Sequence, residues 1–129
     1  LESVFYQFLN YYKIVQVAFL RANDDEDENA CVNWIDQQLL LMSQNDNITN
    51  LTQDAQGLKT TQGSVPTVGR YLKHTFRDAV SHVGVLVRMV KSGYPTINPD
   101  NLSDQRRYRT AISVIEELAR KIIEKGMQK

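Results

Sequence analysis

The sequence predicts an all-α protein, an up-and-down four-helix bundle with a long loop between the second and third helices. Three observations lead to this prediction. Apolar residues recur every three or four positions along four segments, which places them on one side of a helix. The β-branched run from Ile14 to Leu20 could form a strand, but no second alternating run exists for it to pair with. The links between the first and second segments and between the third and fourth are short, as in a bundle of antiparallel neighbours.

The size and composition of the chain indicate one domain over residues 1–129. With 129 residues, 42% of them hydrophobic, it can bury a sizeable core without disulfides or a structural metal. The single Cys31 excludes an internal disulfide and a cysteine-rich zinc site. No apolar stretch is long enough for a membrane span. Because the sequence opens abruptly and shows no signal-peptide pattern, we expect a domain excised from a larger, cytoplasmic protein.

The first two helices are predicted around an acidic turn. The first spans about Val4 to Ala22, and the second starts near Glu28 with Asp27 as its cap. The expected inward residues of the first helix are Phe5, Phe8, Leu9, Tyr12, Val15 and Phe19. Those of the second are Cys31, Trp34, Ile35, Gln38, Leu39 and Met42. The apolar far end of the second helix, residues 39–42, is expected to be buried on two sides.

The long loop is predicted from Ser43 to about Val65. This stretch is rich in Asn, Asp, Thr, Gln, Ser and Gly and has almost no large apolar residue, so it should not pack firmly. A short helical turn around Leu51 to Gln56 would shorten it.

The third and fourth helices are predicted as an antiparallel hairpin. The third has the seam spacing of closely packed helices, with Pro66 in its first turn and Gly93 at its end. Its seam residues are Val68, Leu72, Phe76, Ala79, Val83, Leu86 and Val90. The fourth is expected to be capped by Ser103, to end at Gly126, and to bury Tyr108, Ala111, Ile115, Leu118 and Ile122. A rigid extended turn over Tyr94–Pro99 links the two.

The net charge of zero hides an asymmetry between the two halves of the chain. Residues 1–64 hold three Lys/Arg and nine Asp/Glu, and residues 65–129 hold twelve and six. The basic residues gather on the outer side of the third helix and at the start of the fourth. This pattern indicates either a solvated face that meets the acidic run 24–28 of the same molecule, or a docking face for an acidic partner or phosphate groups. The expected partner-binding residues are Arg70, Lys73, His74, Arg77, Arg106 and Arg107.

A non-catalytic interaction or assembly module is the function that these features predict. Its partner would be a protein offering an acidic segment to the basic side, or an amphipathic helix to a hydrophobic groove. Nucleic acid is a less suitable partner, because the aromatic residues fall on the buried stripes. The sequence contains no nucleophile elbow, phosphate loop or dinucleotide fingerprint, so we expect neither an enzyme nor a cofactor. The acidic run 24–28 lacks the pattern of a calcium loop, and no metal site is expected.

One alternative function is centred on His74. The spacing His74-x-x-Arg77, followed by Gly84 on an amphipathic helix, resembles the histidine phosphotransfer domains of two-component signalling, which are four-helix bundles of about this size. The resemblance implies a phospho-accepting role for His74. Those domains, however, place a glycine where this chain has Asp78, whose carboxylate would repel an incoming phosphoryl group.

Two further patterns bear on function. The stretch from His82 to Ile123 resembles the helix pairs of focal-adhesion-targeting and other vinculin-like bundles, which bind amphipathic partner helices. Acceptor patterns for N-glycosylation occur at Asn47, Asn50 and Asn101, which leaves a secreted four-helix cytokine-like ligand as an alternative. A secreted protein of this size would usually carry paired cysteines, and this chain has none to pair.

Overall fold

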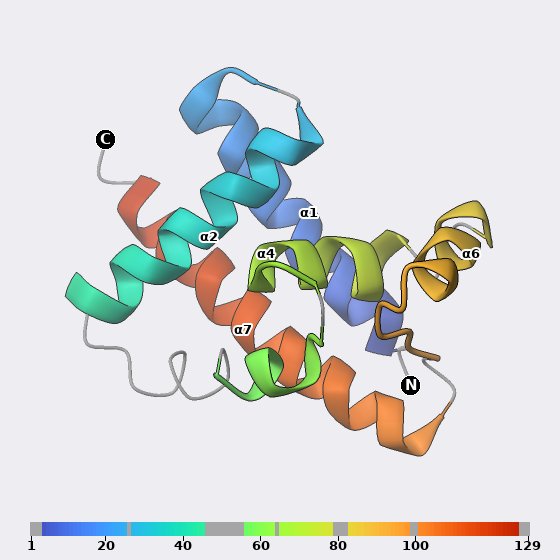
Figure 1. The fold of residues 1–129 in the computed structure, drawn as a ribbon. Helices are drawn as coiled ribbons and strands as arrows, with labels where there is room; N and C mark the ends of the chain where they lie inside the picture. Colours follow the sequence, from blue (N-terminus) through green and yellow to red (C-terminus); the bar gives the residue numbers. More distant parts are fainter. Residues whose placement is uncertain are drawn as a thin grey trace.

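The computed structural model describes residues 4–25, 27–45, 56–63, 65–78, 83–98 and 101–126. Within these ranges the chain forms helices and no strands, so the predicted all-α class is confirmed (Figure 1). The elements are α1 (Val4–Asn23), α2 (Glu28–Asn45), α4 (Val68–Tyr71), the π-helix η1 (Leu72–Asp78), α6 (Val83–Lys91) and α7 (Leu102–Gly126). Residues 56–61 are also helical. No helix in these ranges is long and apolar enough to span a membrane.

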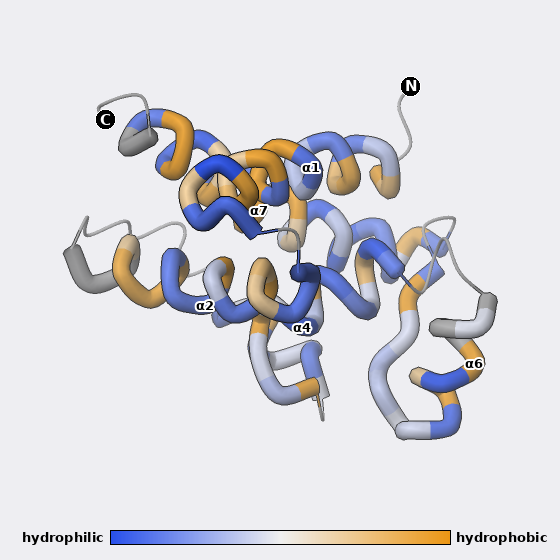
Figure 2. Tube along the Cα trace, turned by 90° about the horizontal axis from the view of Figure 1, so that it is seen from above, coloured by the Kyte–Doolittle hydropathy of each residue, from blue (hydrophilic) through white to orange (hydrophobic). Residues whose placement is uncertain are grey.

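The helices form two layers, with α1 and α7 in one and α2 and α4 in the other (Figure 2). The pairing of α1 with α7 is the most extensive in the fold. Phe8 of α1 contacts Tyr108 near the start of α7, and Ile14 lines a groove with Ile123 near its end. The two helices therefore run in the same direction.

This direction differs from the predicted up-and-down bundle, in which the first and fourth helices would be antiparallel. The prediction of topology was therefore wrong, although the residues of both predicted inner stripes are buried except Phe5 and Leu9, which are half-buried. The buried residues of these stripes are Phe8, Tyr12, Val15, Phe19, Tyr108, Ala111, Ile115, Leu118 and Ile122.

The predicted third helix is interrupted. It begins as α4, widens into η1, and resumes as the separate helix α6 beyond residues that the structure does not describe. The early seam residues Val68, Leu72 and Phe76 are buried as expected, but Val90 is 63% exposed and Met89 is buried in its place. In a π-helix each residue advances by a smaller angle than in an α-helix, so a stripe spaced for an α-helix drifts round the axis.

The predicted hairpin of the third and fourth helices is also absent. Helix α6 packs against η1 and lies to one side of the molecule, whereas α7 packs chiefly against α1 (Figure 1). The seam positions Ala79, Val83 and Leu86 have side chains outside the described part of the chain.

The helix ends agree with the sequence in part. Asp27 Oδ1 accepts the backbone N–H of Asn29, which confirms the predicted cap of α2. Gly93 has a φ of +71° just after α6, where a residue without a Cβ is favoured. The predicted cap Ser103 is wrong, because Asn101 Oδ1 accepts the first free N–H groups of α7. Pro66 was predicted in the first turn of the third helix, but it lies just before the helix, because Thr67 is the N-cap of α4.

Two predictions about apolar residues between the second and third helices were also wrong. Leu40 and Leu41, at the far end of α2, are 58% and 44% exposed, so that end is not buried on two sides. The segment read as a loose loop contributes Leu58 and Val65 to the core. Burying one apolar side chain per turn is enough to anchor a polar helical segment. The low overall apolar content of the segment does not reveal such single buried residues. Most of the predicted turn at Leu51–Gln56 lies outside the described residues.

Candidate functional site

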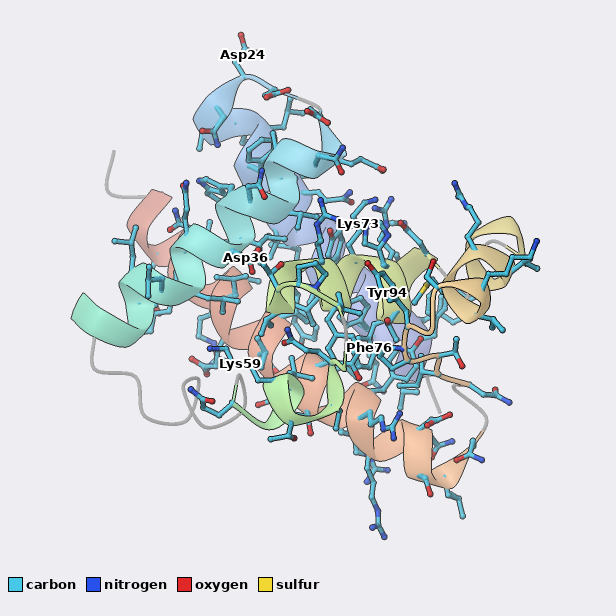
Figure 3. All side chains as sticks on the ribbon, in the orientation of Figure 1. Asp24, Asp36, Lys59, Lys73, Phe76 and Tyr94 are labelled. Atoms are coloured by element: carbon cyan, nitrogen blue, oxygen red, sulfur yellow. The ribbon has the colours of Figure 1, made fainter. Side chains whose placement is uncertain are left out.

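An open cleft of about 450 Å³ lies where η1 faces α6 and the first turn of α2. Its lining combines charged and polar residues with the side chain of Met89. The lining residues are Glu28, Arg70, Lys73, His74, Arg77, Asp78, Arg88, Met89, Ser92 and Tyr94. Lys73 and Tyr94 are labelled on this part of the molecule in Figure 3.

A largely buried ion-pair cluster forms one wall of the cleft. The Lys73 ammonium lies 3.1 Å from Asp78 Oδ2 and 3.4 Å from Glu28 Oε2, and only 8% of the Lys73 side chain is exposed. Partial burial raises the pKa of Glu28, but the nearby cations Lys73 and Arg77 outweigh this effect and hold it below its usual range. The Lys73 charge is therefore neutralised inside the molecule.

The π-helix makes the Lys73–Asp78 pair possible. Residues five apart point in different directions on an α-helix, whereas they lie one above the other when the turn is widened to the i→i+5 spacing. Lys73 and Asp78 are five residues apart, and both side chains lie inside η1. The widened turn thus brings a cation and a carboxylate to the same side.

Arg77 connects η1 to both α1 and α2. Both of its terminal nitrogens donate to Glu28 Oε1 at 3.3 Å, and Nη1 lies 3.7 Å from Asp78 Oδ1. Its guanidinium carbon lies 5.3 Å from the centroid of the buried Tyr12 ring, in a cation–π contact. Arg77 is held in place from three sides, so its role is largely internal.

His74, Arg70 and Arg88 form the other wall. His74 Nδ1 lies 3.9 Å from Asp78 Oδ2, which is too long for a hydrogen bond. Burial lowers the pKa of His74, and the cations Lys73, Arg70 and Arg88 lower it further against the opposite effect of Asp78. Within the described ranges neither Arg70 nor Arg88 has an ion-pair partner.

The charges of the cleft do not cancel. Four cations, Arg70, Lys73, Arg77 and Arg88, face two carboxylates, so the formal charge of the lining is +2 with His74 neutral. Both carboxylates are paired with Lys73 and Arg77, which leaves the excess charge on the other two arginines.

The structure brings together four of the six predicted site residues. Arg70, Lys73, His74 and Arg77 line the cleft, but Arg106 and Arg107 lie on the first turns of α7 and are not part of it. Arg107 is 3.8 Å from Asp104 on its own helix, and Arg106 is exposed.

The predicted solvent-facing basic side needs a correction at Lys73. This residue is buried and paired because η1 turns it toward the acidic start of α2. The interpretation that basic residues meet the acidic turn of the same molecule is therefore correct for Lys73 and Arg77, through Glu28. The predicted site residues do not include Arg88, which belongs to the basic outer side predicted for the third helix, or Tyr94, which was predicted in the turn after that helix.

The model of one family, described as methylamine utilization protein MauJ, matches residues 1–124. The chain belongs to the MauJ family. Among curated proteins and solved structures, none matches this chain. The family match covers every residue that lines the cleft, from Glu28 to Tyr94.

Two other residues singled out by the sequence are used structurally. Cys31 is buried, as predicted, and burial raises the pKa of its thiol to about 11, so it stays protonated and unreactive. Asn101, one of the acceptor patterns for glycosylation, is exposed and uses its side-chain oxygen to cap α7. Asn47 and Asn50 lie outside the described residues.

Proposed function

We propose that this chain is a non-catalytic interaction module that binds an acidic segment of a partner protein in the cleft. The observation that carries the proposal is the pair of guanidinium groups of Arg70 and Arg88. They line a cleft of charge +2 and have no ion-pair partner among the described residues. Carboxylates of a partner would supply the missing charge, with bidentate hydrogen bonds that guanidinium groups favour.

The internal ion pairs support this assignment, because they engage both carboxylates that line the cleft among the described residues. Glu28 and Asp78 are already engaged by Lys73 and Arg77. Breaking those pairs to serve Arg70 or Arg88 would leave a buried cation unpaired, which is costly. An external anion is therefore the better partner for the second wall.

The family description concerns methylamine utilization, and the charge of the cleft bears on what that role can be. Methylamine is a cation at neutral pH, and a cleft of charge +2 repels a small cation. The cleft therefore supports an accessory role, in which the chain binds an acidic protein of that process and does not bind the amine itself.

Phosphotransfer through His74 receives less support than binding. The Asp78 carboxylate lies close to the His74 ring nitrogen, where it would repel a phosphoryl group. The lowered pKa of His74 follows from burial and from the surrounding cations.

The test uses a fluorescently labelled hexa-aspartate peptide as the probe. We expect binding that weakens about tenfold or more as salt rises from about 50 mM to about 300 mM, because exposed charges are screened. The double variant Arg70→Glu/Arg88→Glu should abolish binding. The matched control Arg106→Glu/Arg109→Glu makes the same change of charge on exposed residues of α7, away from the cleft, and should bind nearly as the unmodified chain does. Equal loss in both variants, or no loss in the first, would contradict a binding site in the cleft.

A further inference from the structure

Helix α6 carries an apolar side that the fold does not cover. Val87 and Val90 are 45% and 63% exposed, although the opposite residue Met89 is buried and faces the cleft. The helix lies apart from the two layers of the fold (Figure 2) and packs against η1. Exposed apolar residues next to a candidate site are typical of protein-binding surfaces.

The apolar side of α6 borders the positive cleft. With about 100° of rotation per residue, Lys91 lies between Val87 and Arg88 around the helix axis. Arg88 lines the cleft, and both Lys91 and Arg88 are exposed. Lys91 and Arg88 therefore lie between the apolar side of α6 and the part of the cleft that Arg70 and His74 line.

We propose that the partner's acidic segment is an amphipathic helix that lies along α6. Its apolar face covers Val87 and Val90, and carboxylates on one flank face Lys91 and Arg88 and enter the cleft toward Arg70. This inference rests on the proposed function and adds the secondary structure and orientation of the ligand. An extended acidic segment would satisfy the cleft but would leave the two valines in water.

The same surface suits an anionic membrane less well. Helices that lie in a membrane interface expose broad apolar faces with large residues such as Trp, Phe and Leu, and many are 20–30 residues long. Among the side chains of α6 that the structure describes, the exposed large apolar residues are the two valines. A narrow strip of this kind matches the width of one partner helix.

The experiment compares two synthetic peptides of identical composition. In the first, leucines at helical spacing form one face and aspartates and glutamates occupy one flank; in the second, the same residues are scrambled. Binding of each peptide is measured by titration with the whole chain. We expect the amphipathic peptide to bind about tenfold more tightly than the scrambled one, because it alone removes apolar surface from water.

Two variants that do not change the charge of the chain test where the tighter binding of the amphipathic peptide arises. Val87→Ser/Val90→Ser should remove the advantage and leave binding of the scrambled peptide unchanged. The control Ile14→Ser/Ile123→Ser alters two residues of similar exposure in the groove between α1 and α7, and should keep the advantage. Circular dichroism establishes that both variants are folded.

The other outcomes overturn the inference in distinguishable ways. If both peptides bind the unmodified chain equally, the helical partner is wrong and the proposed acidic ligand stands. Loss of the advantage in the Ile14/Ile123 variant alone would move the docking site to the other groove. If neither peptide binds, both proposals fail. Binding to phosphatidylserine vesicles that Val87→Ser/Val90→Ser abolishes, without peptide binding, would replace the partner helix by a membrane surface.

Discussion

Lys73 is a cation removed almost completely from water and compensated by two carboxylates. Its ammonium contacts Glu28 from α2 and Asp78 from its own element, so these ion pairs join η1 to α2 at the edge of the cleft. A buried ion pair adds little to stability compared with apolar residues of the same shape. Removing one member is nevertheless costly, because it leaves the charge of the other buried and uncompensated. The fold therefore depends on keeping this cluster complete.

Replacing Lys73 with Met should destabilise the chain by about 3 kcal/mol, because Asp78 is then left partly buried with one fewer cation. The free energy of unfolding is measured by urea denaturation. The control is Lys121→Met, which removes an exposed pair with Glu124 on α7 and should cost less than about 0.5 kcal/mol. Similar losses in the two variants would show that burial of Lys73 has no energetic consequence.

His74 should make binding in the cleft dependent on pH. Its pKa is lowered by burial and by Lys73, Arg70 and Arg88, so in the free chain the ring is neutral at pH 7. An anion in the cleft favours the protonated ring, so binding takes up a proton, and affinity for hexa-aspartate should rise severalfold as pH falls from about 8 to about 5.5. Aspartate side chains remain ionised throughout this range.

The variant His74→Gln separates this effect from the rest of the cleft. It keeps a polar side chain and removes the titrating ring, so affinity should become nearly independent of pH over the same range. The unfolding free energy moves in the opposite direction in the unmodified chain: a lowered His pKa means that the unfolded state binds the proton first, so stability decreases as pH falls below about 6.5. A pH profile that His74→Gln leaves unaltered would assign the dependence to another group.

At the scale of elements, η1 is the feature that shapes the cleft. A π-helix is rare and occurs mostly as a single widened turn within α-helical segments, frequently at functional sites. The buried Tyr108 hydroxyl donates to the carbonyl oxygen of Phe76 at 2.8 Å, and the two rings pack edge to face. Thr75 is fixed in the same way, since its hydroxyl donates to the Pro95 carbonyl. Helix α7 and the turn after α6 thus hold η1 from two sides.

Tyr108→Phe should cost about 1.5 kcal/mol of stability, because it leaves the buried Phe76 carbonyl without this donor while preserving the ring. The Tyr11→Phe variant is a suitable control. Tyr11 lies on the partly exposed side of α1, and no hydrogen bond of its hydroxyl is seen among the described residues. Equal unfolding free energies for the two variants in urea denaturation would mean that the Phe76 carbonyl finds another donor.

The contact between α2 and α4 depends on a glycine. Gly69 N–H donates to Asp36 Oδ1 at 2.7 Å, and Asp36 lies on α2 facing α4 (Figure 3). A Cβ at Gly69 would lie 2.8 Å from that carboxylate oxygen, closer than real Cβ contacts. No sequence period marks this position, because the requirement arises only when the two helices meet.

Gly69→Ala should therefore destabilise the chain by about 2 kcal/mol, through the clash and the strained hydrogen bond. Gly84→Ala is the control, and we expect it to have the opposite effect on stability. Gly84 lies in α6, and apart from the adjacent residues and backbone of its own helix no atom lies within 4 Å of an added Cβ, so alanine should stabilise by about 0.5 kcal/mol through helix propensity. Thermal unfolding of both variants gives the comparison, and a neutral Gly69→Ala would show that α2 and α4 can separate freely.

The sequence predicts individual helices better than their continuity. The stripes of α1 and α7 are correct because each is a long run of regular spacing, and Asp27 and Gly93 mark helix ends by their own chemistry. The change to a π-helix after Tyr71 has no periodic signature, since Leu72 and Phe76 fit both kinds of helix. Four cleft residues were found because they share this short stretch, and Arg88 and Tyr94 were missed because they arrive from beyond the interruption.

At the scale of the molecule, the first and last described helices pack against each other. Helices α1 and α7 lie side by side in the same direction, so the first and last described helices form one layer. An amphipathic stripe indicates that a helix has a buried side, but it does not specify which other helix covers that side. The topology was therefore not predictable from the stripes. The same folding brings the acidic first half against the basic second half at Glu28, which accounts for part of the charge asymmetry in the sequence.

This arrangement predicts a gradient of local stability across the molecule. The cores of α1 and α7 are lined by fully buried side chains, whereas in α6 Met89 is the buried one among the side chains that are described. Regions with few buried apolar contacts open at a lower free energy than the global unfolding. Amide hydrogen exchange should therefore be fastest in α6 and slowest in the central turns of α1 and α7. Addition of the amphipathic acidic peptide should slow exchange in α6 selectively, because it covers that helix. Uniform protection across the three helices in the free chain would show that α6 is as firmly packed as the layer formed by α1 and α7.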